Sequence, residues 1–518
     1  MSGRHGKPLR GLMSTKTSPL FQGRFGRMFR SLPAAQYGNS ETESRANLMK
    51  LGDFMTSDFD PPKDGPDAEE SGIPALYTYF GQFIDHDITF DPMSSLIKHT
   101  DPDALTDFRT PALDLDNVYG RGPDDQPYMY DSGHSFLLGD KISGGGDPNA
   151  QDLPRSNTTP ARAIIGDPRN DENSIVSQLQ GLFLRFHNRT VKDHPEIDPQ
   201  AHFHKLQKIV RFHYQFVVLH DFLPRIIHSS VLEDLKTNGH FDRHKLKFFH
   251  WRDEPFMPVE FSVAAYRLGH SMIRPGYRLN DAVLLPIFPV SKTMFPPNGI
   301  PEGLTGFRKM ISVWGIDWGR FIDIDIRPYG VDSQPPDGPT KKRLQFAYRI
   351  DTSVVTPISD LPPAVASDPS SLPQRNLLRS FELGLPSGQD VARAMGVTPL
   401  NDDEILVGKA VDAPDPGDVK GTIASISDLS VFQGNCPLWT YILAEAARFQ
   451  EPVKIPVQED MTITTPRLGP VGGRIVAEVF LGMMYGDNDS LLNLEPHWQP
   501  ALGPDYQLKD FVKYALGS

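Results

Sequence analysis

The sequence contains a single cysteine, Cys436, among its 518 residues. One cysteine cannot form an intramolecular disulfide, and it cannot build a cysteine-rich zinc or iron–sulfur site. Free cysteine behaves as a small hydrophobic residue, so we expect Cys436 to be buried. Disulfide-stapled folds and cysteine-based metal centres are therefore excluded.

Excess basic charge and long apolar runs are also missing. Lys and Arg number 52 against 65 Asp and Glu, a net charge of -13. This balance disfavours nonspecific binding to nucleic acid or to anionic membranes, which needs a basic surface. No window approaches about 18 consecutive apolar residues, so no membrane span is expected. The N-terminal residues 1–33 lack the apolar core of a secretory signal, which leaves a cytoplasmic location or export by a non-classical route.

Strand signals are few and short, whereas apolar residues recur at helical spacing in several long segments. The predicted helices fall within residues 72–88, 173–194, 205–227 and 469–487. The 48 prolines interrupt the helices throughout the chain. We therefore expect a mainly α protein with long ordered loops and few short strands. An irregular N-terminal arm over residues 1–50 would precede one large domain over residues 51–518.

The stretch "GQFIDHDITF" places a histidine between two carboxylates, Asp85-His86-Asp87. On a helix, Gln82, Asp85 and His86 point to one side, and Asp87 is rotated about 100° beyond His86. The same helix carries an apolar stripe, so the polar groups need partners to be buried. Taken alone, the triplet fits a helix-end salt-bridge network, a carboxylate–histidine metal site, or a histidine that acts as an acid and base.

Three further polar segments have a structural and a functional interpretation each. "RTPALDLDNVYG" carries Thr110, Asp114 and Asp116 at even spacing, which suits either a calcium loop outside the EF-hand class or a turn with capping aspartates. In "GDPRNDENS", Arg169 and Glu172 form either a surface ion pair or part of a site. His270 in "YRLGHSMIRP" is a core histidine or a ligand.

Together these segments resemble the animal haem peroxidase family, in the family's order along the chain. "GQFIDHDITF" looks like its distal-histidine helix, "TPALDLDNVYG" like its calcium loop and "GDPRNDE" like its distal-arginine segment. "YRLGHSMIRP" looks like the proximal-histidine helix, and "LPQRNLLRSFELGLP" like the segment that follows it. The resemblance covers roughly residues 50–500. It implies a haem-dependent peroxidase domain.

The resemblance implies a role for each matching residue on the peroxide side of the haem. His86 would be the distal acid and base, Arg169 its cationic partner, and Gln82 a neighbour of the peroxide and halide position. An imidazole can accept and return a proton near neutral pH, and an arginine can stabilise the charge of a leaving oxygen. Asp85 and Glu172 would form ester bonds to methyl groups of haem b.

The other carried-over roles concern the iron, the propionates and calcium. His270 would be the proximal iron ligand, and Asn376 would accept a hydrogen bond from its other ring nitrogen. Arg267 and Arg379 would meet the haem propionates. The Ca²⁺ ligands implied by the family are Asp87, Thr110, the carbonyl of Ala112, Asp114 and Asp116.

The resemblance implies reduction of hydrogen peroxide and oxidation of small electron donors. Asn173 follows Glu172 where one branch of the family has a haem-bonded methionine, so bromide, iodide, thiocyanate or phenols are expected rather than chloride. A fatty-acid dioxygenase of the same superfamily is the alternative. Its radical tyrosine would stand three residues before His270, where this chain has Arg267, and the helical rotation is expected to aim Tyr266 elsewhere.

Two rivals from other classes depend on fewer of these segments. A non-haem metallohydrolase built on Asp85-His86-Asp87 would need further ligands, and the chain has no HExxH motif. A non-catalytic calcium-binding adhesive protein would keep the aspartate loop but has no use for Arg169 or His270.

Overall fold

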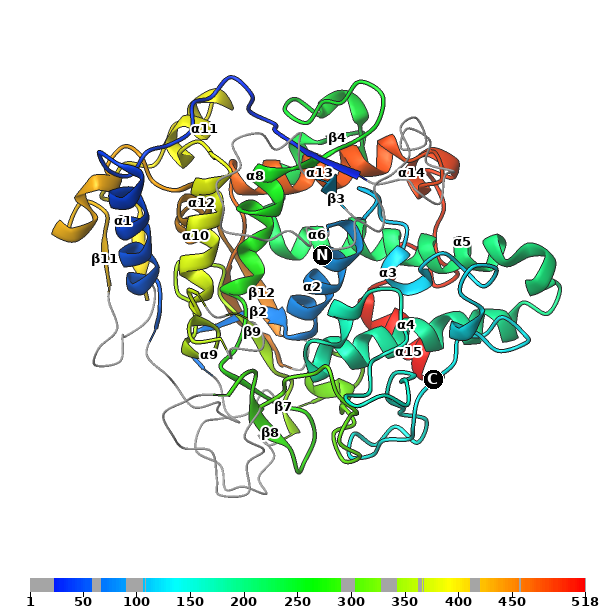
Figure 1. Cartoon of the computed structure of the whole chain (residues 1–518). Coiled ribbons are helices and arrows are strands. Elements are labelled where there is room, and N and C mark those ends of the chain that lie inside the picture. Colours follow the sequence, from blue (N-terminus) through cyan, green and yellow to red (C-terminus); the bar gives the residue numbers. More distant parts are fainter. Residues whose placement is uncertain are drawn as a thin grey trace, which may run out of the picture.

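Helices form most of the regular structure in the computed structural model, as predicted from the sequence (Figure 1). The structure describes residues 23–57, 67–89, 106–107, 109–289, 303–327, 342–361, 366, 368–409, 420–455 and 458–517. The longer helices are α1 (Glu41–Phe54), α2 (Leu76–Ile88), α4 (Ser174–Asp193), α5 (Pro199–Val217), α10 (Leu372–Glu382), α12 (Leu438–Ala446), α13 (Gly472–Gly486) and α15 (Leu508–Leu516).

Shorter helical turns connect the longer helices. Those of α type are α3 (Asp116–Tyr119), α6 (Leu223–Ile226), α7 (Ser229–Asp234), α8 (Val259–Ser262), α9 (Thr356–Ser359), α11 (Gly388–Ala394) and α14 (Leu491–Leu494). The 3-10 turns used below are η3 (Pro168–Asp171), η6 (Ala265–His270) and η7 (Trp318–Arg320).

The strands of the described residues are short and form small separate sheets. They are β1 (Gly23–Gly26), β2 (Glu70–Pro74), β3 (Thr106–Asp107), β4 (Lys236–Thr237), β5 (His240–Phe241), β6 (Met257–Pro258), β7 (Gly276–Arg278), β8 (Leu284–Pro286), β9 (Phe346–Tyr348), β10 (Leu406–Gly408), β11 (Lys420–Thr422), β12 (Gln450–Ile455) and β13 (Gln458–Pro466). β1 pairs antiparallel with β3 and parallel with β6. The other pairs are antiparallel: β2 with β9, β4 with β5, β7 with β8, β10 with β11, and β12 with β13.

Helix α2 lies near the middle of the molecule, with α10 and α12 on one side and α4 and α15 on the other (Figure 1). Its apolar stripe of Leu76, Phe80 and Phe83 is at most 1% exposed. Phe83 stacks on Phe183 of α4, with ring centroids 4.1 Å apart. Burial of each phenylalanine contributes about 2–3 kcal/mol, so this packing fixes α2 against α4.

The predicted helices are confirmed in position, with two local differences. Residues 72–74 belong to strand β2, and α2 begins at Leu76, after Pro74. The predicted helix over residues 205–227 lies within α5 and α6, and a widened π-type turn over Val218–Phe222 separates them. Pro224 has no N–H to donate into the preceding turn, which accounts for an irregularity at this point.

The prediction of an irregular arm over residues 1–50 is wrong for the part that the structure describes. Residues 23–26 form β1, and α1 begins at residue 41 and crosses the expected boundary. Ser40 caps α1 by accepting a hydrogen bond from the backbone N–H of Glu43 at 3.1 Å. Leu48 and Leu51 are fully buried, and α1 packs on α10. Helix α1 has too little apolar periodicity for the sequence alone to reveal it. Residues 1–22 lie outside the described part.

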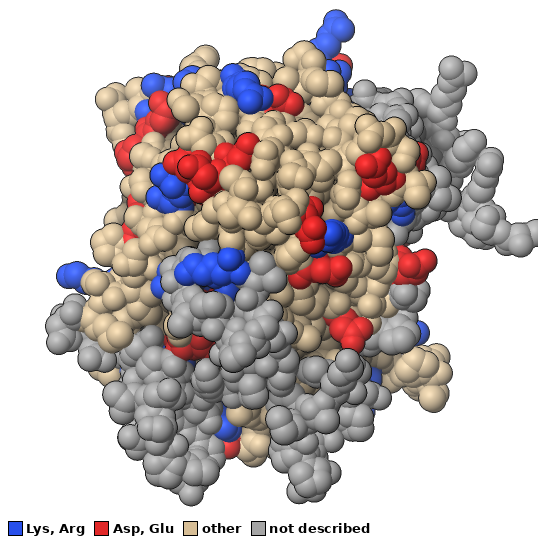
Figure 2. Space-filling model, turned by 90° about the vertical axis from the view of Figure 1, so that its left-hand side faces the viewer, with Lys and Arg blue, Asp and Glu red and all other residues tan. Residues whose placement is uncertain are grey.

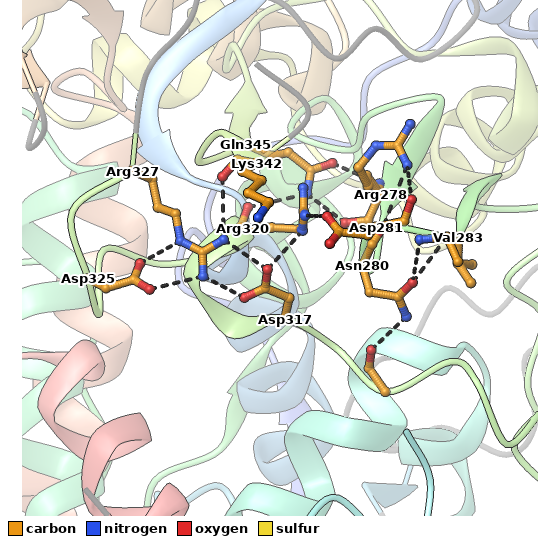
Figure 3. Close-up of polar contacts among 12 residues, drawn as sticks. Arg278, Asn280, Asp281, Val283, Asp317, Arg320, Asp325, Arg327, Lys342 and Gln345 are labelled. Carbon is orange, nitrogen blue, oxygen red and sulfur yellow. Dashed lines mark hydrogen bonds and ion pairs between the residues drawn. The ribbon is translucent and has the colours of Figure 1, made fainter. Parts of the chain in front are cut away.

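An ion-pair network joins the turn after β7 to the segment around η7 (Figure 3). Arg327 donates to both Asp317 oxygens at 2.7 and 2.8 Å and also pairs with Asp325. Arg320, whose side chain is 1% exposed, donates to Asp317 at 3.0 Å and to Asp281 at 2.5 Å. Asp281 is 63% exposed, so the buried guanidinium of Arg320 depends mainly on Asp317 for a protected partner. Loss of Asp317 would leave this buried charge poorly compensated, so the network fixes the two loops relative to each other.

Over the described residues on the face shown in Figure 2, acidic and basic side chains are interspersed. Among the described helices, none combines the length and the apolar character that a membrane crossing requires.

Candidate active site

A cavity of about 730 Å³ collects the predicted site residues from four parts of the chain. One set comes from α2 and from the junction of η3 with α4, and the other comes from η6 and α10. The predicted residues in its wall are Gln82, Asp85, His86, Arg169, Glu172, Arg267, His270, Asn376 and Arg379. Residues separated by almost 300 positions therefore share one enclosed space.

His86 is 5% exposed and reaches the cavity from the buried part of α2. Its Nδ1 lies 2.7 Å from Oδ1 of Asn170, whose Nδ2 in turn donates to Gln180 at 2.8 Å. In this arrangement Nδ1 carries the proton, and Nε2 is left as an acceptor. Burial, and then the charge of Arg169, lower the pKa of His86 to about 4. His86 is therefore neutral at pH 7.

Arg169 is held by the end of α2 and by one carboxylate. Its Nη2 donates to the carbonyls of His86 at 3.0 Å and Thr89 at 2.6 Å, and to Asp167 at 2.7 Å. Burial alone would raise the pKa of Asp167, but Arg169 and Arg109 hold it below the usual range. The guanidinium is thus fixed beside His86 with its charge partly balanced.

Gln82 and Glu172 are hydrogen-bonded across the cavity wall. Nε2 of Gln82 donates to Oε1 of Glu172, and Nδ2 of Asn173 donates to Oε1 of Gln82 at 3.3 Å. Enclosure in the wall raises the pKa of Glu172 to about 7, although Arg169 opposes the shift. Asp85, one helical turn from Gln82, lies 3.8 Å from Arg267.

His270 ends η6, and its Nδ1 lies 2.7 Å from the amide of Asn376 on α10. Burial, and then Arg267, lower the pKa of His270 to about 3, so this ring is also neutral. The amide nitrogen faces the ring, so Asn376 donates, the reverse of the predicted direction. A half-turn of the amide exchanges Nδ2 and Oδ1 with almost no change of shape, and metal ligation through Nε2 requires that rotamer.

Asn376 and Arg379 are on the face of α10 that lines the cavity. The α10 residues in the wall are Leu372, Arg375, Asn376 and Arg379, at helical spacing. Ser371 caps this helix, and Pro373 stands in its first turn. Local helix signals therefore present the amide and two guanidinium groups to one space.

Tyr266 also lines the cavity, and the prediction that its side chain points elsewhere is wrong. Its hydroxyl donates to the carbonyl of Gly81 at 3.2 Å, and its ring stacks on Phe261 at 4.7 Å. The type of turn does not account for this position, because successive residues of the 3-10 turn η6 are about 120° apart, more than in an α-helix. Tyr266 and Arg267 both line the wall, so the cavity extends along more than one face of η6.

Next to α2, three carboxylates form a second cluster. Asp87, Asp114 and Asp116 each offer an oxygen within 4.8 Å of the others. Oδ1 of Asp87 and Oδ1 of Asp116 are buried and have no hydrogen-bond partner among the described residues. Burial raises the pKa of all three groups, to about 6 for Asp114. These features fit a hard cation, which would satisfy the unpaired oxygens and remove the repulsion.

Thr110 and Ala112 lie in the same turn as this cluster. The hydroxyl of Thr110 donates to Asp114 at 2.6 Å, and the N–H of Ala112 donates to the carbonyl of Thr110 at 2.8 Å. Tyr214 donates to the second oxygen of Asp87 at 3.0 Å. The structure thus brings the side chains of the predicted calcium ligands together.

Comparisons with known proteins found similar sequences and similar folds. The family model described as "Animal haem peroxidase" matches residues 97–317. The chain is 24% identical over 185 residues to chorion peroxidase of Aedes aegypti, covering 32% of this chain and 23% of that protein. It is 23% identical over 238 residues to thyroid peroxidase of Rattus norvegicus, covering 41% and 24%. The chain spans about a quarter of the length of these relatives.

The fold is similar to that of peroxidase A from Dictyostelium discoideum, with a TM-score of 0.56, 15% identity, and 96% of this chain and 93% of that chain covered. The chain belongs to the animal haem peroxidase family. The fold of this family member is also similar to that of a fatty acid alpha-dioxygenase from Arabidopsis thaliana, with a TM-score of 0.50, 15% identity, and 95% and 77% covered.

The cavity of this family member fits a haem by the chemistry of its donors. His86 and His270 are both buried and neutral, and each binds an amide through Nδ1. For His86 this leaves Nε2 as an acceptor, and for His270 the same holds once the amide of Asn376 is turned so that its oxygen faces Nδ1. Arg267 and Arg379 in the same wall suit the carboxylates of haem. Neutral imidazole is the form that binds iron, so the two histidines and the two arginines are the donors that a haem requires.

Sequence reasoning missed the residues that hold the predicted ones in place. Arg109 pairs with Asp116 at 3.3 Å and with Asp167 at 2.5 Å, so it links the carboxylate cluster to the partner of Arg169. Asn170 binds His86. Arg109 and Asp167 lie inside two of the segments singled out from the sequence, which was the available signal, but a place in the sequence does not show which charges meet.

Proposed function

We propose that the chain is a peroxidase that reduces hydrogen peroxide at a haem ligated by His270. The observation that supports this most directly is the pair formed by a neutral His86 and a fixed Arg169 in the cavity that also contains His270. Haem supplies the redox-active iron at which peroxide is reduced. The protein supplies the ligand, the proton transfers and the positive charge.

His86 moves the proton in this proposal. Heterolysis of peroxide requires one proton to leave the inner oxygen and reach the outer one. Nε2 of a neutral His86 can accept this proton from the inner oxygen and deliver it to the outer oxygen, while Nδ1 stays hydrogen-bonded to Asn170. Arg169, always cationic, stabilises the negative charge that develops on the departing oxygen.

The proposal assigns haem positioning to Arg267, Arg379 and Asn376, and Ca²⁺ binding to the aspartate cluster. Arg267 and Arg379 would bind the propionates, and Asn376, with its amide turned, would accept from His270. Calcium on Asp87 would fix the end of α2 one residue from His86. Thr110 and the carbonyl of Ala112 would complete the oxygen ligands.

Ester bonds from Asp85 and Glu172 to haem methyl groups form a finer part of the proposal. Both carboxylates line the cavity, and Glu172 is held by Gln82. We expect acid–butanone extraction of peroxide-treated protein to leave haem bound, and the double variant Asp85→Asn/Glu172→Gln to release it. Complete release from the unmodified protein would contradict the ester bonds.

Small donors such as bromide, iodide, thiocyanate and phenols are the proposed substrates. A fatty-acid dioxygenase is the second candidate, because the fold also resembles an alpha-dioxygenase and Tyr266 lines the cavity. Tyr266→Phe separates the two functions. It should leave iodide oxidation by peroxide unchanged, whereas a dioxygenase that uses this tyrosine would lose oxygen uptake with a fatty acid.

One spectrum tests the main proposal. Protein supplemented with haem should show a Soret band and oxidise iodide or guaiacol only when peroxide is added. His270→Ala should lose both signals, and His250→Ala, an exposed histidine outside the cavity, should keep both. Absence of a Soret band in the unmodified protein would reject haem binding.

A further inference from the structure

We propose that Asn173 is a positioning residue that decides which end of the Gln82 amide faces Glu172. Asn173 is 3% exposed and caps α4. Its Oδ1 accepts from the backbone N–H groups of Ile175 at 3.0 Å and Val176 at 2.9 Å. A backbone N–H can only donate, so the cap must use the amide oxygen of Asn173. The amide nitrogen is therefore the atom that points away from the cap.

The cap fixes the donor and the acceptor of each hydrogen bond between Asn173 and Glu172. Nδ2 of Asn173 can only donate, so it requires the oxygen of Gln82, at 3.3 Å. Gln82 must then turn Nε2 toward Glu172, where it donates to Oε1. A glutamine amide without such partners can turn over with little change in shape. Here two N–H groups at the start of α4 select one of the two orientations.

The residues that carry this relay are held on a rigid backbone. The N–H of Ser174 donates to the carbonyl of Leu304 at 2.8 Å, and the N–H of Gly306 donates to the carbonyl of Glu172 at 2.8 Å. A side chain at residue 306 would collide with the carbonyl of Asp171, so the close approach requires glycine. Asn173 therefore has little freedom to follow Gln82 if the latter moves.

The orientation has a chemical consequence for Glu172 and for the cavity. With Nε2 toward Glu172, Gln82 stabilises the ionised carboxylate of the haem-free protein, and it can donate to an oxygen of the ester where that bond has formed. In both states N–H groups rather than an oxygen border this part of the cavity. With the amide reversed, two acceptor oxygens would meet, and Glu172 would have to hold a proton. The relay thus favours small anions and peroxide over cationic donors. This inference rests on the proposed function.

The variant Asn173→Ser separates the capping of α4 from the orientation of the Gln82 amide. Serine caps helices about as well as asparagine, is neutral, and is too short to donate to Gln82. We expect haem content and melting temperature to change little, and bromide affinity, measured by titration of the Soret band, to fall about tenfold, the effect of one hydrogen bond. Asp198→Asn at the cap of α5, outside the cavity, is the matched control and should leave both unchanged.

A double-mutant cycle and an apoprotein measurement make the test decisive. If Asn173 acts through Gln82, Asn173→Ser should have no effect on bromide affinity in a Gln82→Ala background. In the haem-free protein, carbon-13 NMR of labelled glutamate should show the Glu172 carboxyl titrating at higher pH in Asn173→Ser. Unchanged titration and unchanged bromide affinity would overturn the inference, as would an equal loss in both backgrounds. Failure of haem binding would reject the proposed function and leave the NMR comparison intact.

Discussion

At the scale of single residues, the cavity depends on side chains held in one protonation state. His86 and His270 are neutral because burial disfavours the imidazolium form, and each has a cationic arginine nearby. Arg169 is paired with the buried carboxylate of Asp167 at 2.7 Å, which balances part of its positive charge. A neutral base beside a fixed cation is the combination that moves a proton and stabilises an anion.

We expect His86→Ala to slow the reaction with hydrogen peroxide by about 10²–10⁴-fold, the usual contribution of a positioned general base. Haem should remain bound, because the proposed ligand, His270, is unchanged. Stopped-flow absorbance of the Soret band measures both the rate and the haem content. An unchanged rate would remove His86 from the mechanism.

The pH dependence of the same step follows from the pKa of His86. Only the neutral ring can accept the peroxide proton, so the rate should be constant above about pH 5 and fall as the pH drops through about 4. Asn170→Asp places a carboxylate against Nδ1, which should raise the pKa of His86 and move the fall to higher pH. A fall centred near 6.5 in the unmodified protein would show that burial does not control this group.

At the scale of elements, α2 connects the two clusters. Its residues 85 and 86 line the cavity, and Asp87 turns toward the carboxylate cluster. Arg109 joins that cluster to Asp167, beside Arg169. Occupancy of the cluster should therefore affect the cavity through the end of α2.

Calcium removal should lower the melting temperature and reverse its dependence on pH. In the metal-free protein the raised pKa values of Asp87, Asp114 and Asp116 mean that the folded state binds more protons than the unfolded state. Stability is then lost as the pH rises from about 4 through about 6. Ca²⁺ replaces those protons and should add about 2.7 kcal/mol at a hundredfold excess over its Kd.

Thermal unfolding with EDTA or with Ca²⁺, followed between about pH 5 and 8, tests this expectation. Asp114→Asn should abolish the response to Ca²⁺, and the exposed Asp125→Asn should keep it. Equal melting temperatures with and without Ca²⁺ would argue against a calcium site.

At the scale of the whole molecule, the N-terminal segment belongs to the packed structure. Strand β1 pairs with β3 and β6, and α1 packs on α10, which carries Asn376 and Arg379. The cavity wall even includes Phe25. The extent of the catalytic domain is therefore proposed to include residues 23–50.

Leu51→Ala tests this proposal. Leu51 is fully buried, so its truncation should lower stability by about 2–5 kcal/mol, the transfer term plus the cavity left behind. Met49→Ala, at a neighbouring position that is 39% exposed, should have a much smaller effect. Denaturant unfolding measures both variants. Similar small changes in the two would mean that α1 contributes little to the fold.

Much of the fold was predictable because it depends on local patterns. The helices around residues 174–193 and 472–486 follow from apolar periodicity. Helix α1 was missed because its burial comes from contact with α10, more than 300 residues away. The place of Tyr266 in the cavity wall was missed because several distant segments form that wall, and the rotation along one helix does not show how far the wall extends.

By itself, the sequence determined the helical class, the exclusion of cysteine chemistry and the family, because periodicity, composition and ordered motifs are properties of the chain. It also supplied the residue types of the cavity. Only the tertiary structure decided which of them meet. The pairing of His86 with Asn170, of Arg109 with Asp167, and the orientation of Gln82 by Asn173 depend on long-range packing and on the direction of hydrogen bonds, neither of which has a local sequence signature.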